Sequence, residues 1–259
     1  MQDDTREHKR FDEQTLPGQR VNLSLGTLLL PMRPSAQLVI HFHGPAWAVE
    51  VCARKRYPGA AVLTVQLEGA SDVYREPFAD PARYLAWIAE AETVSKVKFK
   101  SVVVSSFSAG YGAVRELVRN RANWPRIDGV VLADSLHADY GTEEKDLGPF
   151  VDFAREAKTG RKFFLFSHSE VYPGTYLSTT ETASFLLTQL GLKRRPILLW
   201  GTLGMQQLSV VAAGGLQILG FAGNSAPDHV DHFFALEDWY ARLFPGKSKA
   251  ALPATRRPS

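Results

Sequence analysis

Short apolar runs separated by mixed polar and apolar segments form the main pattern of this chain. The runs are rich in valine, leucine, isoleucine and phenylalanine, and turn-forming residues bound several of them, which is typical of buried strands. They cover residues 37–43, 61–65, 101–105, 129–133 and 162–166. The segments between them predict helices at about 47–56, from about 80 onwards and at 111–118. Because parallel neighbours need such crossover connections, we expect an α/β fold with a mostly parallel central sheet flanked by helices on both faces.

Two further patterns lie outside these runs. Partial alternation in residues 21–30 suits an edge strand or a hairpin. Residues 208–221 have the pattern of two strands around a Gly-Gly turn. An irregular stretch follows them, and a last helix is predicted from about His229 to Leu243.

The two ends of the chain differ from its middle. Residues 1–17 are polar and predict a flexible arm, and residues 246–259 predict a disordered tail. We therefore expect a single domain over residues 18–245. It contains no internal repeat, and no insertion in it is long enough to form a large cap domain.

Composition narrows the classes of partner. The 259 residues carry a formal net charge of +3, and the lysines and arginines are scattered, so nucleic acid is not an expected partner. The single cysteine, Cys52, allows no internal disulfide. No window is long and apolar enough for a membrane span. The first residues lack the apolar core of a signal peptide, so we expect a cytoplasmic protein or a secreted one whose signal has been removed. The oligomeric state is left open.

The segment Ser106–Gly110 carries the clearest chemical signal. It directly follows the apolar run at 101–105 and precedes a predicted helix, so Ser108 stands at the apex of a strand–turn–helix unit. This is the arrangement of a nucleophile elbow, in which a strained turn lifts a serine hydroxyl clear of the sheet. The turn requires small residues two positions before and after the nucleophile. Here they are Ser106 and Gly110, where the usual pattern has glycine at both.

A serine nucleophile needs a base, and two histidines near the end of the chain compete for that role. His229 follows the last predicted strand, on a loop that begins the last helix, and would point back over the sheet edge. His232 lies one turn further along the same helix face. We favour His229, because His232 begins the apolar face of the helix and has the surroundings of a packed histidine.

Two carboxylates compete to orient the base. Asp134 comes immediately after the run at 129–133, so its side chain should emerge at the carboxyl edge of the sheet. Glu170 lies a few residues beyond the next run. We favour Asp134 because it is nearer to the end of its strand, and Glu170 remains the alternative.

An oxyanion needs two backbone donors. The amide of Ala109, directly after the nucleophile, is the first candidate. The second should come from the loop after His43-Gly44, and Pro45 has no N–H, so Ala46 or Trp47 must supply it. Substrate-binding side chains are expected among the aromatic residues of these loops, namely Tyr111, Tyr140 and Tyr172.

Together these residues resemble the α/β-hydrolase family over roughly residues 20–245. The resemblance depends on His43-Gly44 after an early strand, the Ser106–Gly110 elbow, and the chain order of serine, acid and histidine. It implies an eight-stranded, mostly parallel sheet and a serine hydrolase that acts on esters through an acyl-enzyme. We therefore expect a carboxylesterase for small acyl esters, acting on a small-molecule or acylated substrate, with no cofactor and no metal. An acyltransferase or a peptidase would use the same residues.

Two other functions remain as alternatives. His41 and His43 lie on one face of a strand, a spacing that some metal-dependent hydrolases use to hold zinc. His137, His168 and Asp228 could complete such a site. The fold could also serve as a non-catalytic binding module, although all three triad roles have candidates in this sequence.

Overall fold

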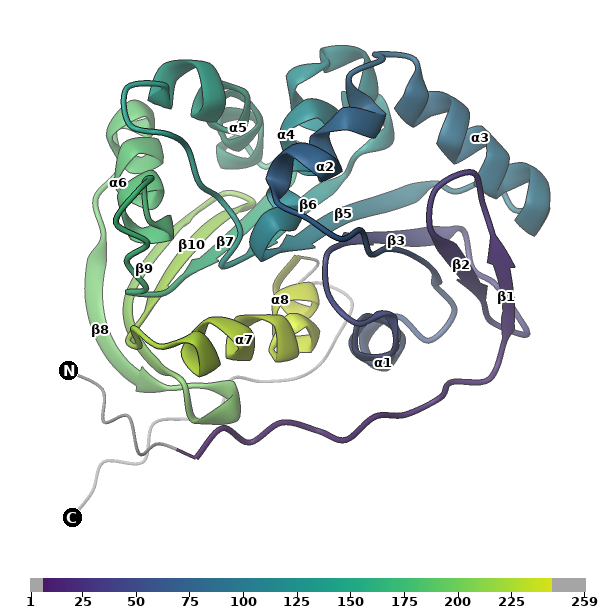
Figure 1. The fold of residues 1–259 in the computed structure, drawn as a ribbon, viewed down its shortest axis with the longest axis horizontal. Coiled ribbons are helices and arrows are strands. Elements are labelled where there is room, and N and C mark those ends of the chain that lie inside the picture. The colour runs from purple at the N-terminus through teal and green to yellow at the C-terminus, as the bar shows by residue number, and fades with distance from the viewer. Residues whose placement is uncertain (1–6, 244–259) are drawn as a thin grey trace.

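The computed structural model describes residues 7–243, and ten strands form one sheet within them (Figure 1). Their order across the sheet is β1-β2-β4-β3-β5-β6-β7-β10-β9-β8. The six central strands, from β4 to β10, run parallel to one another. Their bounds are β4 Ala61–Val65, β3 Gln37–Phe42, β5 Ser101–Phe107, β6 Gly129–Ala133, β7 Phe163–His168 and β10 Leu216–Phe221. The predicted mostly parallel sheet is thus confirmed.

Antiparallel strands extend both edges of this parallel core, which gives ten strands rather than the eight that the resemblance implies. On one edge β1 (Gln19–Asn22) and β2 (Thr27–Leu30) form a hairpin. On the other, β9 (Gln206–Ala213) pairs with β10 around the predicted Gly-Gly turn, and β8 (Arg195–Trp200) pairs with β9.

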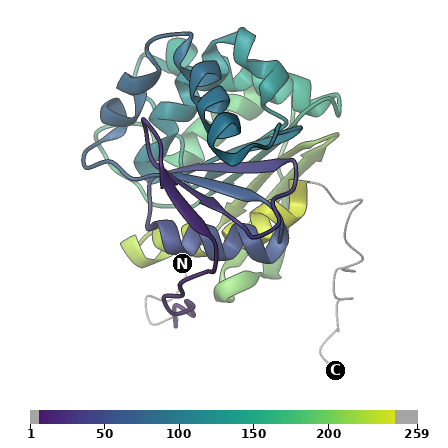
Figure 2. The same cartoon turned by 90° about the vertical axis from the view of Figure 1, so that its right-hand side faces the viewer.

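Helices cover both faces of the sheet, as predicted (Figures 1 and 2). One face packs against α2 (Ser71–Arg75), α3 (Arg83–Ser95), α4 (Tyr111–Arg119), α5 (Glu143–Lys158) and α6 (Thr179–Leu190). The other packs against α1 (Ala46–Arg56), α7 (Ala226–Phe234) and α8 (Leu236–Leu243). Successive strand residues serve opposite faces: Val102 and Val104 join the first core and Val103 the second. No helix in residues 7–243 has both the length and the apolarity needed to cross a membrane.

The ends of two helices differ from their predicted positions. The last helix begins at Ala226 rather than His229 and breaks at Ala235 into α7 and α8. The reason is a capping box, in which Ser225 accepts from the amide of Asp228 and Asp228 accepts from the amide of Ser225. His229 therefore lies within α7 and not on the loop before it.

Residues 7–17 form neither helix nor strand, yet they pack along the side of the molecule that carries α1 and α7 (Figure 1). The ring of Phe11 makes edge contacts with Trp47 of α1 and Phe234 of α7, at centroid distances of 5.6 and 5.2 Å. The polar composition of residues 7–17 does not predict this packing. The tail predicted at 246–259 lies outside the described residues.

Candidate active site

Three adjacent parallel strands end in residues with a left-handed backbone. His43 follows β3 with φ 70°, Ser108 follows β5 with φ 46°, and Asp134 follows β6 with φ 45°. Such conformations are costly for residues other than glycine and cluster at functional sites. All three lie at the carboxyl edge of the sheet, where parallel α/β sheets bind their ligands.

The elbow at Ser108 has the close packing that its turn requires. A single 3₁₀ turn, Ser108–Gly110, joins β5 to α4. A Cβ atom on Gly110 would lie 2.2 Å from the carbonyl oxygen of Phe42, so no larger residue fits there. Ser106, in place of the other usual glycine, is fully buried and its hydroxyl lies 2.8 Å from that of Ser135. Close contacts therefore explain why the motif has small residues at these two positions.

His229 and Asp134 meet at this edge, although 95 residues separate them. The Nδ1 of His229 donates to Oδ2 of Asp134 at 2.6 Å. Asp134 is buried and also accepts from the amide and hydroxyl of Ser169, at 2.9 and 2.6 Å, and from the hydroxyl of Thr179. This shell fixes the carboxylate. The bond to Nδ1 leaves Nε2 of His229 as the unprotonated nitrogen when the ring is neutral.

The charge state of Asp134 suits that bond. Burial alone would raise the pKa of this carboxyl, but the nearby imidazole of His232 and the bonds from His229 and Ser169 outweigh it. The net effect is a pKa well below the ordinary value. Asp134 is thus an anion that can hold and orient an imidazole.

The structure does not bring Glu170 to an imidazole. Its side chain is exposed, and its carboxylate accepts from the amide of Gly223 at 3.3 Å. Its own amide donates to the carbonyl of the same glycine. Glu170 therefore stabilises the loop that leads from β10 to α7.

His232 lies in the core between α7 and the sheet. Its Nδ1 is 2.9 Å from the hydroxyl of Ser167, and its ring contacts those of Phe221 and Trp239. Its Nε2 is buried and has no hydrogen-bond partner among the described residues. Burial lowers its pKa to about 4. These are the surroundings of a packed histidine, the role that made it the less favoured base.

Within residues 7–243 no hydrogen bond joins Ser108 to His229. In the part of the chain that the structure describes, the Ser108 hydroxyl makes no hydrogen bond. The ring of His229 packs on Phe107, the residue before the serine, with centroids 4.5 Å apart. Catalytic hydrogen bonds are often long in unliganded enzymes and tighten with substrate. The contact between Ser108 and His229 stays a prediction.

The loop after β3 is held in place by its histidines. Both ring nitrogens of His41 are engaged, Nδ1 with the hydroxyl of Ser105 at 2.8 Å and Nε2 with the carbonyl of His43 at 2.9 Å. Helix α1 begins at Ala46, so the amides of Ala46 and Trp47 have no acceptor within the helix. The indole of Trp47 packs on Phe11 and Phe234, so only its backbone is left for the predicted oxyanion role.

A cavity of about 270 Å³ opens beside Ser108. Of the predicted substrate-binding tyrosines, Tyr111 lines it, whereas Tyr140 and Tyr172 are exposed outside it and lie 3.3 Å apart at their hydroxyls. Sequence reasoning missed Tyr176, which was given no role, and His137, which was considered only as a metal ligand. The complete lining is Ala70, Ser71, Ser108, Ala109, Tyr111, His137, Ala138, Asp139 and Tyr176. A larger cavity of about 450 Å³ lies at the opposite edge of the sheet, where β3 and β5 begin.

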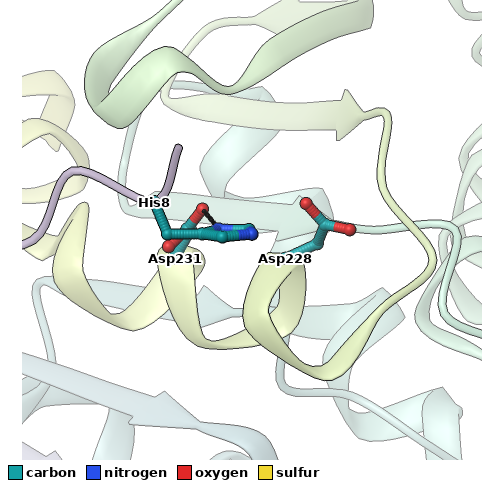
Figure 3. Close-up of side chains that lie close together, drawn as sticks. All are labelled: His8, Asp228 and Asp231. Carbon is teal, nitrogen blue, oxygen red and sulfur yellow. Dashed lines mark hydrogen bonds and ion pairs between the residues drawn. The ribbon is translucent and has the colours of Figure 1, made fainter. Parts of the chain in front are cut away.

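The histidines proposed for a metal site have other partners. His41 uses both nitrogens on protein atoms, and Nδ1 of His43 lies 2.9 Å from the hydroxyl of Tyr74. Among residues 7–243, the side chains spaced as metal ligands are instead His8, Asp228 and Asp231, whose ligand atoms lie within 4.8 Å of one another (Figure 3). In that group His8 already bonds to Asp231 at 2.7 Å.

Comparison with solved structures supports the fold. No protein-family model and no curated protein matches the sequence. Among solved structures, the enterobactin esterase of Shigella flexneri aligns with a TM-score of 0.54 and 11% identity, over 90% of this chain. This chain spans 61% of the length of that esterase structure.

Two smaller structures align over more of their own length. A candidate α/β hydrolase from Agrobacterium tumefaciens gives a TM-score of 0.49 at 16% identity, over 89% of this chain and 98% of its own. The acetyl xylan esterase of Aspergillus awamori gives 0.47 at 11% identity, over 81% and 93%. With its parallel core, the elbow after β5 and the likeness to the Shigella enzyme, the chain has the α/β-hydrolase fold.

Proposed function

We propose that this protein is a serine hydrolase that cleaves carboxylic esters, with Ser108 as nucleophile, His229 as base and Asp134 as the orienting acid. One observation carries the proposal: His229 bonds to the buried anion Asp134 at 2.6 Å while its ring packs against the residue before Ser108. The left-handed backbone of Ser108 adds support, since an elbow of this kind exposes its hydroxyl.

The roles follow from the chemistry of the groups. Nε2 of His229 takes the proton of Ser108 as its oxygen attacks the ester carbonyl, and Asp134 stabilises the imidazolium that forms. The amide of Ala109 and that of Ala46 or Trp47 receive the oxyanion. The imidazolium then protonates the departing alcohol, and water releases the acid by the same steps. Loss of one oxyanion donor costs about 3–4 kcal/mol of transition-state stabilisation.

The substrate class follows from the cavity beside Ser108. Its volume of about 270 Å³ fits a small acyl group, and the rings of Tyr111 and Tyr176 form part of its wall. The esterase activity named for the Shigella structure fits the same reaction class. We therefore propose esters of small acids as substrates, with Tyr111 as a substrate-binding residue.

Labelling with a fluorophosphonate, followed by mapping of the modified peptide, tests the assignment. We expect one label, on Ser108, and hydrolysis of p-nitrophenyl acetate or butyrate. Ser108→Ala should lose both while keeping the circular dichroism spectrum and melting temperature of the wild type within a few degrees. Ester hydrolysis that persists in Ser108→Ala, or a label on another residue, would refute the proposal. Transfer of the acyl group to an added alcohol in preference to water would instead identify an acyltransferase.

A further inference from the structure

A chain of buried hydroxyls links the elbow to the loop after β6. The hydroxyl of Ser135 donates to the carbonyl oxygen of Ser108 at 2.8 Å, and the hydroxyl of Ser106 lies 2.8 Å from that of Ser135. A serine hydroxyl has one proton. Because Ser135 gives its proton to the carbonyl, Ser106 must be the donor to Ser135. The hydrogen bonds therefore run in one direction, from Ser106 through Ser135 to the carbonyl of Ser108.

That carbonyl belongs to the same peptide group as the N–H of Ala109, the amide proposed to receive the oxyanion. A peptide group is planar, so a bond that fixes the carbonyl oxygen also fixes the direction of the N–H. Donors on the oxygen polarise the group and strengthen the bond that its N–H can make. The amide of Tyr111 is a second donor to the same oxygen, so both of its lone pairs are used.

The surroundings of the two serines strengthen their effect on the Ser108–Ala109 peptide. Ser106 and Ser135 are both fully buried, so water does not compete for their bonds. Ser108 has a strained backbone, whose orientation must be held by its neighbours. Ser135 directly follows Asp134, so one loop carries both the proposed acid and the donor to the elbow.

We propose that Ser106 and Ser135 are positioning residues, a relay that orients and polarises the Ser108–Ala109 peptide for oxyanion stabilisation. The inference rests on the proposed function and deepens it. It also gives a reason for serine at position 106, where the usual elbow has glycine. Neither hydroxyl touches the reacting atoms, because both act through the carbonyl of Ser108.

Kinetics of single and double variants test the relay. Ser135→Ala should lower kcat about tenfold with little change in KM, because the oxyanion bond is weakened but its donor remains. Ser106→Ala should lower kcat less, since Ser135 keeps its own bond to the carbonyl. The double variant should be no slower than Ser135→Ala, because Ser106 acts only through Ser135.

Two further measurements separate positioning from a structural role. A trifluoromethyl ketone, which forms a tetrahedral adduct with serine, should bind Ser135→Ala more weakly by about the factor lost in kcat. The midpoint of the pH profile of kcat/KM should not move, since the pair of His229 and Asp134 is intact. Thr64→Val is the matched control: Thr64 is a buried hydroxyl on β4 that donates to Thr27 on β2, so its loss should change stability and leave kcat unchanged.

The outcomes are distinct. Wild-type kcat in Ser135→Ala, or multiplicative losses in the double variant, would overturn the relay while labelling of Ser108 still upholds the esterase. An unlabelled, inactive wild type would overturn the proposed function itself. Should Ser135→Ala fail to fold, Ser106→Ala and Ser106→Gly take its place. Either one at wild-type kcat would then overturn the relay.

Discussion

The role of Asp134 depends on the hydrogen bonds that its carboxylate accepts. Its carboxylate accepts four hydrogen bonds, of which only the one from His229 leads to the proposed base. An asparagine there can present its amide N–H to Nδ1 and force the imidazole into the wrong tautomer. We predict that Asp134→Asn lowers kcat about 10³- to 10⁴-fold.

Glu170→Gln is the control for this change, because its carboxylate accepts from the amide of Gly223 and, within residues 7–243, bonds to no imidazole. We expect its kcat to stay within about twofold of the wild type. Steady-state kinetics on one p-nitrophenyl ester compares the two variants. A severe loss in Glu170→Gln together with an active Asp134→Asn would return the acid role to Glu170.

Some features of the candidate site can be predicted from the sequence, and others cannot. Ser108 and Asp134 could be chosen because each directly follows a recognisable strand, whereas His229 was expected where the last helix begins and lies within α7. The left-handed backbones at His43 and Asp134 could not, since they depend on how three strand ends pack against one another. The relay partner of Ser106 is 29 residues away and leaves no local pattern.

The N-terminal segment contacts α7, the helix that carries His229. Arg10 donates to the fully buried carboxylate of Asp231 at 3.0 Å and to the carbonyl of Pro227 at 2.8 Å. Its guanidinium also lies over the ring of Phe234, 5.4 Å from the centroid. These contacts bind residues 7–17 to α7, beside the second bond of Asp231 to His8 (Figure 3).

We predict that Arg10→Ala lowers the free energy of unfolding by about 1–2 kcal/mol, because a buried carboxylate loses a charged donor that is itself partly exposed. Lys9→Ala is the matched control. Lys9 pairs with Glu7 on the surface, where both side chains are at least 70% exposed, so its loss should cost almost nothing. Urea unfolding measures both, and equal stabilities would show that the segment does not hold α7.

Elements were predictable where burial was complete and hard to predict where it was partial. The central strands are mostly buried and are rich in β-branched residues or, in β7, in phenylalanine, and their bounds match to within two residues. β8 was missed because it is an exposed edge strand that contains proline. The start of α6 could have been predicted from the capping box of Ser178 and Glu181. A search for apolar patterns alone does not detect this motif.

For the whole molecule, the parallel core buries three histidines as neutral rings. Burial lowers the pKa of His41 and His168 to about 3 and that of His232 to about 4. In the unfolded chain each would titrate near 6.5. Between these values the unfolded chain binds protons that the folded protein does not, so stability rises with pH. The free energy of unfolding should therefore fall as the pH decreases from about 6.5 towards 4.

His232→Phe isolates one of these contributions. The ring lies against Phe221 and Trp239, so a phenylalanine ring fits among the same neighbours, and among the described residues the variant loses only the bond between Nδ1 and the hydroxyl of Ser167. Removing one titrating group should reduce the slope of unfolding free energy against pH by up to about 1.4 kcal/mol per pH unit in this window. Urea titrations at several pH values measure the slope. An unchanged slope would mean that His232 is protonated in the folded protein, and loss of ester hydrolysis in this variant would move the base from His229 to His232.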